Sequence, residues 1–179
     1  HKVLEELKQI IRSGERSEYL LSLIGCYESL YIFDKEISII NTNKSKNKYF
    51  NELLRLQIQE PQKEKDISIT IRKYGAIEDS VSIKVKDQYE ENPYPRWRYN
   101  SYSKENKLNF ISVINSEISP NIIQTNSVQL TNKKINILIA GCGTGIQIIE
   151  ASRYINCEIT AIDLSNSSIS YAKRKVDEY

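Results

Sequence analysis

Residues 135–145, INILIAGCGTG, decide the predicted fold, because an apolar run leads directly into a G-x-G-x-G turn. A continuous apolar run is typical of a buried parallel strand, and residues 135–140 have that character apart from Asn136. The glycines permit positive φ and let a ligand approach the backbone closely. The turn then feeds a helix that we expect from Ile146 to about Tyr154.

A second apolar run, Glu158–Asp163, predicts a second strand that ends at a carboxylate. Open α/β sheets bind ligands at the carboxyl edge of their strands, and an ionised Asp there can accept two hydrogen bonds from ribose hydroxyls. Ser165 or Asn166 is expected to cap a further helix. Residues 135–179 therefore predict the order β-α-β-α, and the expected buried face of the last helix carries Ile169, Ala172, Val176 and Tyr179.

The sequence of this turn differs from two common nucleotide-binding motifs. The dinucleotide fingerprint G-x-G-x-x-G has its third glycine where this chain has Ile146, and no Lys-Ser or Lys-Thr follows the turn as in a P-loop. By contrast, ILIAGCGTG followed by ITAIDLS closely resembles the first two motifs of class I S-adenosylmethionine-dependent methyltransferases.

This resemblance implies a cofactor site at the matching positions. Asp163 would hold the ribose hydroxyls and Leu164 would border the adenine. Many members carry an acidic residue where this chain has Ile139, so Gln147 is a candidate to supply part of the lost affinity. The loop that would lie against the methionine part consists of Gly141, Cys142, Gly143, Thr144 and Gly145.

A second segment indicates which group within this family the chain resembles. Residues 87–97, DQYEENPYPRW, are similar to the YEENPYPRW signature of bacterial methyltransferases that often follow tetratricopeptide repeats, and residues 20–36 are similar to the helical segment upstream. We expect a helix over 80–91 that Pro93 ends. Tyr89 and Tyr94 are candidate cofactor contacts. In the alternative, Tyr94 and Trp97 only pack this segment onto the sheet.

The chain divides by pattern into three predicted regions. Residues 1–79 are a helical N-terminal region, residues 80–134 are a connecting helix, an aromatic and proline-rich arm and a loop, and residues 135–179 are a partial Rossmann-like domain. The fold class is therefore α/β, with a helical region before the first half of a methyltransferase sheet. Finer expectations are helical runs over 3–11, 20–31 and 49–59, a linker over 60–66, a strand over 67–71 and a short helix over 110–117.

Charge, cysteine and histidine content argue against several classes. The net charge is only +2, from 25 interspersed basic and 23 acidic residues, so nucleic acid is not an expected partner. The 3 cysteines lack disulfide or zinc spacing, which favours a cytoplasmic protein without a metal site. His1 is the only histidine, so none can activate Cys142, which we expect to fill the tight turn. No apolar stretch approaches a membrane span.

We expect the chain to be a fragment, because His1 replaces a starting Met and only two strands of the sheet precede Tyr179. The leading hypothesis is an S-adenosylmethionine-dependent methyltransferase with an unknown acceptor, for which a protein is one candidate. No catalytic residue is assigned. The alternative is a non-catalytic helical interaction module with a degenerate or incomplete methyltransferase domain, and an NAD-binding oxidoreductase is a third hypothesis.

Overall fold

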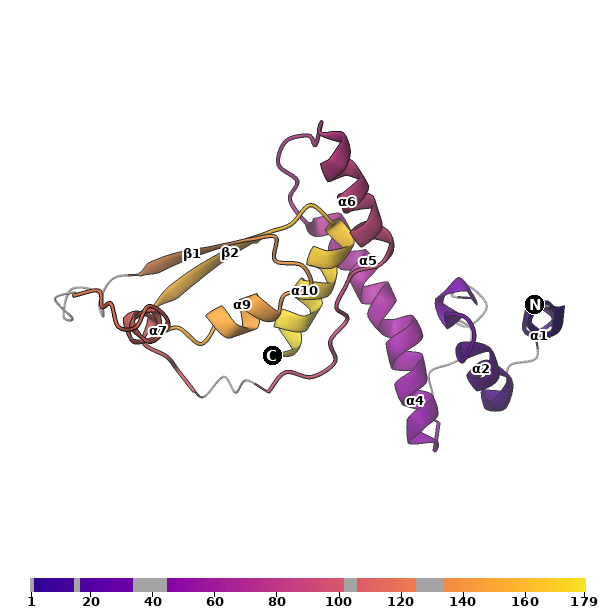
Figure 1. Cartoon of the computed structure of the whole chain (residues 1–179). Helices are drawn as coiled ribbons and strands as arrows, with labels where there is room; N and C mark the ends of the chain where they lie inside the picture. Colours follow the sequence, from indigo (N-terminus) through magenta and orange to yellow (C-terminus); the bar gives the residue numbers. More distant parts are fainter. Residues whose placement is uncertain (1, 15–16, 34–44, 102–105, 125–133) are drawn as a thin grey trace. The chain divides into compact units, whose positions relative to one another are not determined.

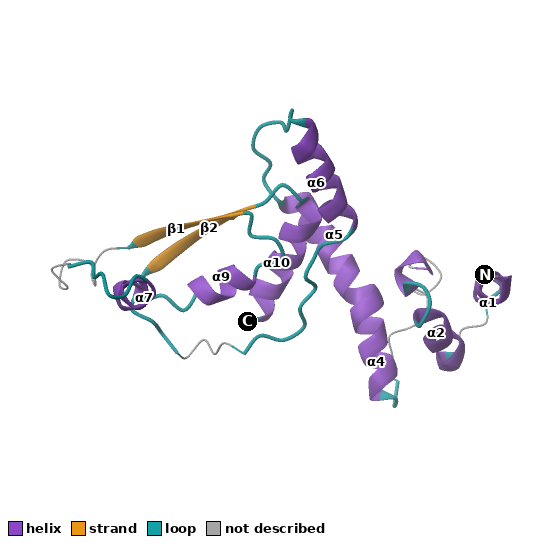
Figure 2. Cartoon of the chain, in the orientation of Figure 1, coloured by secondary structure: helices purple, strands orange, loops and turns teal. Residues whose placement is uncertain are grey.

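The computed structural model gives a mixed α/β protein whose chain forms two compact units, His1–Lys63 and Glu64–Tyr179. Figure 1 follows the chain by colour, and Figure 2 separates helices from strands. His1 and part of the expected loop before residue 134 lie outside the described residues. The structure describes residues 2–14, 17–33, 45–101, 106–124 and 134–179.

The N-terminal unit consists of short helical elements around an apolar core. Ser17 and Asn47 cap α2 and α4 with their side-chain oxygens. The elements are α1 (Lys2–Arg12), α2 (Glu18–Gly25), the 3-10 turn η1 (Leu30–Phe33), α4 (Lys48–Leu54) and the π-helical segment η2 (Arg55–Gln59). The buried core residues are Ile11, Leu20, Leu21, Ile24, Leu30, Phe33 and Phe50.

The predicted helical runs are confirmed, except that the run over 20–31 breaks after Gly25. A side chain distant in sequence holds this break. Gln57 Nε2 donates to the carbonyl of Gly25 at 2.8 Å, and its Oε1 accepts from the N–H of Leu30 at 3.0 Å. The side-chain amide of Gln57 therefore provides hydrogen-bond partners for the carbonyl at the end of α2 and for the N–H at the start of η1. Local periodicity could not indicate this contact.

Residues 60–70 form a helix, α5 (Glu60–Thr70), so the predicted linker over 60–66 and strand over 67–71 are wrong. Pro61 has no N–H to donate, and the turn before it is π-helical, with the N–H of Glu60 donating to the carbonyl of Arg55. The wider turn accommodates the proline, and the helix continues through it. The straight-chain residues over 62–65 are good helix formers, which outweighs a short alternation.

The C-terminal unit contains the predicted β-α-β-α order. The strands pair in parallel, with Ile135 opposite Cys157 and Ala140 opposite Ile162, so Asp163 follows the end of the second strand. The first helix after the sheet turn ends at Ala151 and not near Tyr154. The elements are α6 (Ser80–Glu91) and α7 (Phe110–Glu117), both with the predicted bounds, then β1 (Ile135–Ala140), α9 (Ile146–Ala151), β2 (Cys157–Ile162) and α10 (Asn166–Glu178).

The strands are buried on one face only, which corrects the expectation of a fully buried run. Both strands alternate between half-buried and exposed residues. Helix α9 lies along one face of the sheet in Figure 1. On the opposite face, Leu138 is 64% exposed and Ile162 is 45% exposed. Because successive side chains of a strand point to opposite faces, helices on one face leave every second side chain in water.

The buried face of α10 also differs from the prediction. Val176 is exposed, whereas Arg174 and Lys175 are buried beside Tyr171 and Ala172. Arg174 Nε contacts a Glu64 carboxylate oxygen at 2.9 Å, and Lys175 Nζ contacts Glu178 at 2.7 Å. Paired cations can be buried with their aliphatic stems, so an apolar stripe is not required there.

Gly145 can be tested as the packing contact between the glycine loop and α10. Its φ is +89°, and an added Cβ would lie 2.7 Å from the Cβ of Ala172. Gly145→Ala should therefore combine backbone strain with overpacking and lower the free energy of unfolding by about 2–5 kcal/mol. Urea unfolding followed by Trp97 fluorescence measures this change.

Gly75→Ala is the matched control. Gly75 has φ +66°, but an added Cβ would meet no atom within 4 Å, so this variant should cost only about 1–2 kcal/mol of backbone strain. Equal losses in the two variants would contradict the packing role of Gly145.

Candidate functional site

The glycine loop, residues 141–145, is hydrogen-bonded to the end of β2. The N–H groups of Gly141 and Cys142 both donate to the carbonyl of Ile162, at 2.8 Å and 3.0 Å. Gly141 and Gly143 have φ of +71° and +49°, and a Cβ added to either would meet no protein atom within 4 Å. The loop is therefore open at these two glycines, unlike at Gly145, where α10 packs closely.

Asp163 joins this loop to the start of α10. Its Oδ2 accepts a hydrogen bond from the N–H of Gly143 at 2.8 Å, and its Oδ1 accepts one from the N–H of Ser165 at 2.9 Å. A carboxylate has about four lone-pair sites, so acceptor capacity remains on Asp163 after these two bonds. Asp163 therefore lies at the carboxyl edge of the sheet, as predicted, and contacts the glycine loop directly at Gly143.

A second carboxylate, that of Glu90 on α6, contacts the start of α10. Ser165 is fully buried and caps the helix, with its Oγ accepting from the N–H of Ser168 at 3.0 Å. Glu90 Oε2 accepts from Ser165 Oγ and from the N–H of Ser167, each at 3.1 Å. Sequence reasoning missed Glu90 as a site residue, although it belongs to the quoted YEENPYPRW segment.

The arm, residues 92–101, reaches the glycine loop through two reciprocal hydrogen bonds. Trp97 Nε1 donates to the carbonyl of Thr144 at 2.9 Å, and Thr144 Oγ1 donates to the carbonyl of Pro95 at 2.6 Å. Figure 2 draws the arm as loop throughout. With Thr144 only 3% exposed, these bonds join the arm to the loop in a largely dry environment.

The ring of Trp97 packs on α10, whereas the packing alternative placed it on the sheet. Its ring lies 6.4 Å from that of Tyr171 and 5.7 Å from that of Tyr179, measured between centroids. Tyr171 donates from its hydroxyl to the Trp97 carbonyl. Lys175 Nζ lies 4.8 Å from the Trp97 ring centroid and donates to the carbonyl of Arg98 at 2.9 Å.

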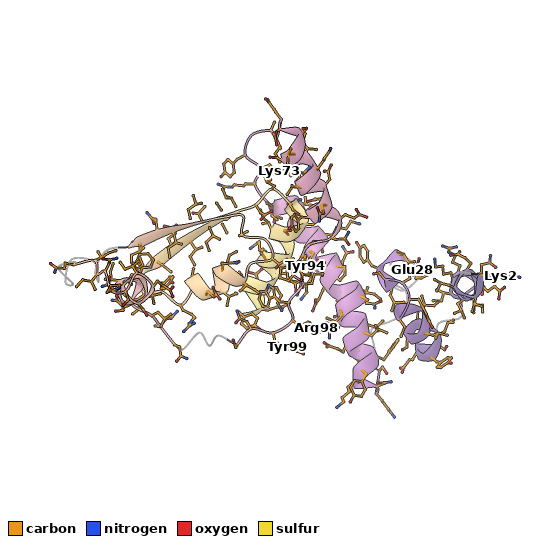
Figure 3. All side chains as sticks on the ribbon, in the orientation of Figure 1. Lys2, Glu28, Lys73, Tyr94, Arg98 and Tyr99 are labelled. Atoms are coloured by element: carbon orange, nitrogen blue, oxygen red, sulfur yellow. The ribbon has the colours of Figure 1, made fainter. Side chains whose placement is uncertain are left out.

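The other predicted site residues are more exposed. Tyr94, labelled in Figure 3, is 73% exposed, and Tyr89 is 39% exposed. In this segment the contacts described above are made by Glu90, Pro95 and Trp97. Leu164 is 46% exposed directly after Asp163, and Gln147 is exposed in the first turn of α9.

The side chain of Cys142 fills the turn, and its thiol has low reactivity. Its side chain is buried, and burial, together with the nearby Asp163 carboxylate, raises the pKa of its thiol to about 11. The thiol therefore stays protonated at neutral pH. Among the described residues, no cluster of three or more His, Cys, Asp or Glu side chains suits a metal ion, and no helix has the length and apolar character needed to cross a bilayer.

The raised pKa of Cys142 predicts slow alkylation. At pH 8, iodoacetamide should modify the exposed Cys26 at least about tenfold faster than Cys142, because the thiolate is the reactive species. Mass spectrometry of peptides from timed samples measures both rates. A denatured sample, in which both should react alike, is the control, and equal rates in the folded chain would contradict the buried state of Cys142.

The bond from Thr144 to the arm predicts a stability effect. Thr144→Val removes the hydroxyl that donates to the carbonyl of Pro95 and should cost about 1–3 kcal/mol. Trp97 is the only tryptophan of the chain, so its emission should also shift to the red as the arm loosens.

The control for this variant is Thr70→Val. The hydroxyl of Thr70 is exposed and bonds to the carbonyl of Ile67 in its own helix, so the loss should stay within about 0.5 kcal/mol and the emission should not move. Unchanged emission and stability in Thr144→Val would show that the arm does not depend on this bond.

Comparisons of the chain with protein-family models, with curated proteins and with solved structures found no match. The chemistry that this site can support is therefore inferred from the residues that form it. These are a glycine loop open at Gly141 and Gly143, a carboxylate at Asp163 with acceptor capacity left, and an arm that is hydrogen-bonded to the loop at Thr144.

Proposed function

We propose that this chain belongs to an S-adenosylmethionine-dependent methyltransferase of class I, and that residues 135–179 are part of its Rossmann-like cofactor domain. The observation that supports this most is the position of Asp163. It follows β2, bonds to the N–H of Gly143 and keeps acceptor capacity beside a glycine loop that has open space on one side. A ribose diol needs such an acceptor at the carboxyl edge of parallel strands.

The residues present fit this cofactor in two respects. Gly141 and Gly143 leave room where any larger side chain would project, so the methionine part can lie against the backbone. Asp163 is held by two N–H donors and is therefore oriented before the ribose arrives. Leu164 and Gln147, both exposed beside the loop ends, are the proposed contacts for the adenine and the amino group.

Bound S-adenosylmethionine would supply a methyl group on a sulfonium, and its in-line transfer to a nucleophilic acceptor atom would break the S–CH3 bond and leave S-adenosylhomocysteine as the neutral thioether. The contribution of this chain to that step is to bind and orient, because positioning accounts for much of the acceleration in such displacements. We assign no catalytic residue, and a protein is one candidate for the acceptor. The proposal includes a cytoplasmic location, because all three cysteines are unpaired thiols.

The role of Asp163 predicts a ligand-binding defect. The chain should bind S-adenosylhomocysteine in calorimetry, and Asp163→Asn should weaken binding about tenfold to a hundredfold, since a hydrogen bond to a charged group contributes about 1.5–3 kcal/mol. Asn keeps the size of the side chain but replaces one acceptor oxygen with a donor.

Asp177→Asn is the control, because Asp177 is an exposed carboxylate on α10 that contacts Lys173 at 3.9 Å. It should leave binding unchanged. NAD is the ligand control and should not bind. A folded wild-type chain that does not bind S-adenosylhomocysteine would contradict the proposed function and favour the alternative of a non-catalytic helical interaction module.

A further inference from the structure

We propose that Glu90 is a positioning residue that holds Asp163 in the orientation required by the ribose of the cofactor. This inference rests on the proposed function and assigns a role to a residue of α6, outside the β-α-β-α unit. Glu90 would not touch the ligand. It would act through the segment that links Asp163 to α10.

The link is a short chain of hydrogen bonds. Glu90 Oε2 accepts from Ser165 Oγ and from the N–H of Ser167, both at 3.1 Å. The N–H of Ser165 in turn donates to Asp163 Oδ1 at 2.9 Å. A single carboxylate oxygen of Glu90 therefore holds the backbone at Ser165 and Ser167 in place. The N–H of Ser165 in turn orients one carboxylate oxygen of Asp163.

The environment makes this link effective. Ser165 is fully buried, so its hydrogen bonds face little competition from water. The carboxylate of Glu90 meets the first turn of α10, where unpaired N–H groups and the helix dipole favour negative charge. Loss of that charge would weaken the two hydrogen bonds that Glu90 accepts from Ser165 and Ser167, because bonds to a charged acceptor are stronger, and would loosen the turn.

The consequence reaches the glycine loop through Asp163. Its second oxygen accepts from the N–H of Gly143 at 2.8 Å, so a rotation of the carboxylate weakens the contact with the loop. The arm contacts the same loop at its next residue, where Trp97 Nε1 donates to the carbonyl of Thr144. Helix α6 and the arm that follows it thus hold both turns that border the proposed ribose position.

A double-mutant cycle tests this role. Dissociation constants for S-adenosylhomocysteine would be measured by calorimetry for the wild type, Glu90→Gln, Asp163→Asn and the double variant. Glu90→Gln should weaken binding about three- to thirtyfold in the wild type, but less than about twofold once Asp163 is replaced, because residues that act as one unit are not additive. Glu91→Gln, an exposed neighbour, is the control and should change nothing.

A ligand-free measurement separates positioning from a general structural role. Amide hydrogen exchange by NMR should show faster exchange at Gly143 and Ser165 in Glu90→Gln, while the amides of β1 keep the protection they have in the wild type. If Glu90→Gln does not fold, Glu90→Asp, which keeps the charge but shortens the reach, takes its place in both experiments.

The outcomes distinguish the two claims. Equal weakening by Glu90→Gln with and without the Asp163 carboxylate, or unchanged exchange at Gly143 and Ser165, overturns the positioning role and leaves the proposed function intact. Failure of the folded wild-type chain to bind S-adenosylhomocysteine overturns the proposed function, and the role of Glu90 with it.

Discussion

The C-terminal unit depends on the two hydrogen bonds that the Asp163 carboxylate accepts, from the N–H groups of Gly143 and Ser165. They join the turn after β1 to the turn after β2. The parallel register makes this possible, because Ala140 and Ile162 end their strands side by side and both turns leave the same edge. A single charged side chain thereby sets the distance between the two loops that border the proposed cofactor position.

Helix α10 transmits this arrangement to the rest of the unit. It begins at the Ser165 cap, packs Ala172 against Gly145, and holds the arm through Tyr171 and Lys175. The buried cations of this helix are matched by acidic groups. Burial opposes ionisation of Glu178, but Lys175 and its neighbouring arginine outweigh that effect and lower the pKa of the carboxyl. These pairs lie within α10, and removal of Glu178 would leave buried charges uncompensated.

Sequence patterns predicted well those elements whose signals are local. The strand over 135–140, the helices over 80–91 and 110–117, and the position of Asp163 at the carboxyl end of the second strand all follow from runs, caps and prolines that act within a few residues. The failures share a different cause. Helix α5 continues through Pro61 because a π turn precedes it, and the buried face of α10 accepts Arg174 because Glu64 lies nearby in space.

The sequence by itself determined the β-α-β-α order and the position of the carboxylate after the second strand, because strand and turn propensities depend on adjacent residues. Only the tertiary structure decided which groups meet across the unit. It brought Glu90 to the cap of α10, Trp97 to the carbonyl of Thr144, and Ala172 against Gly145. These contacts join residues far apart in the chain, and their stability arises from burial and from paired polar groups, which no local pattern encodes.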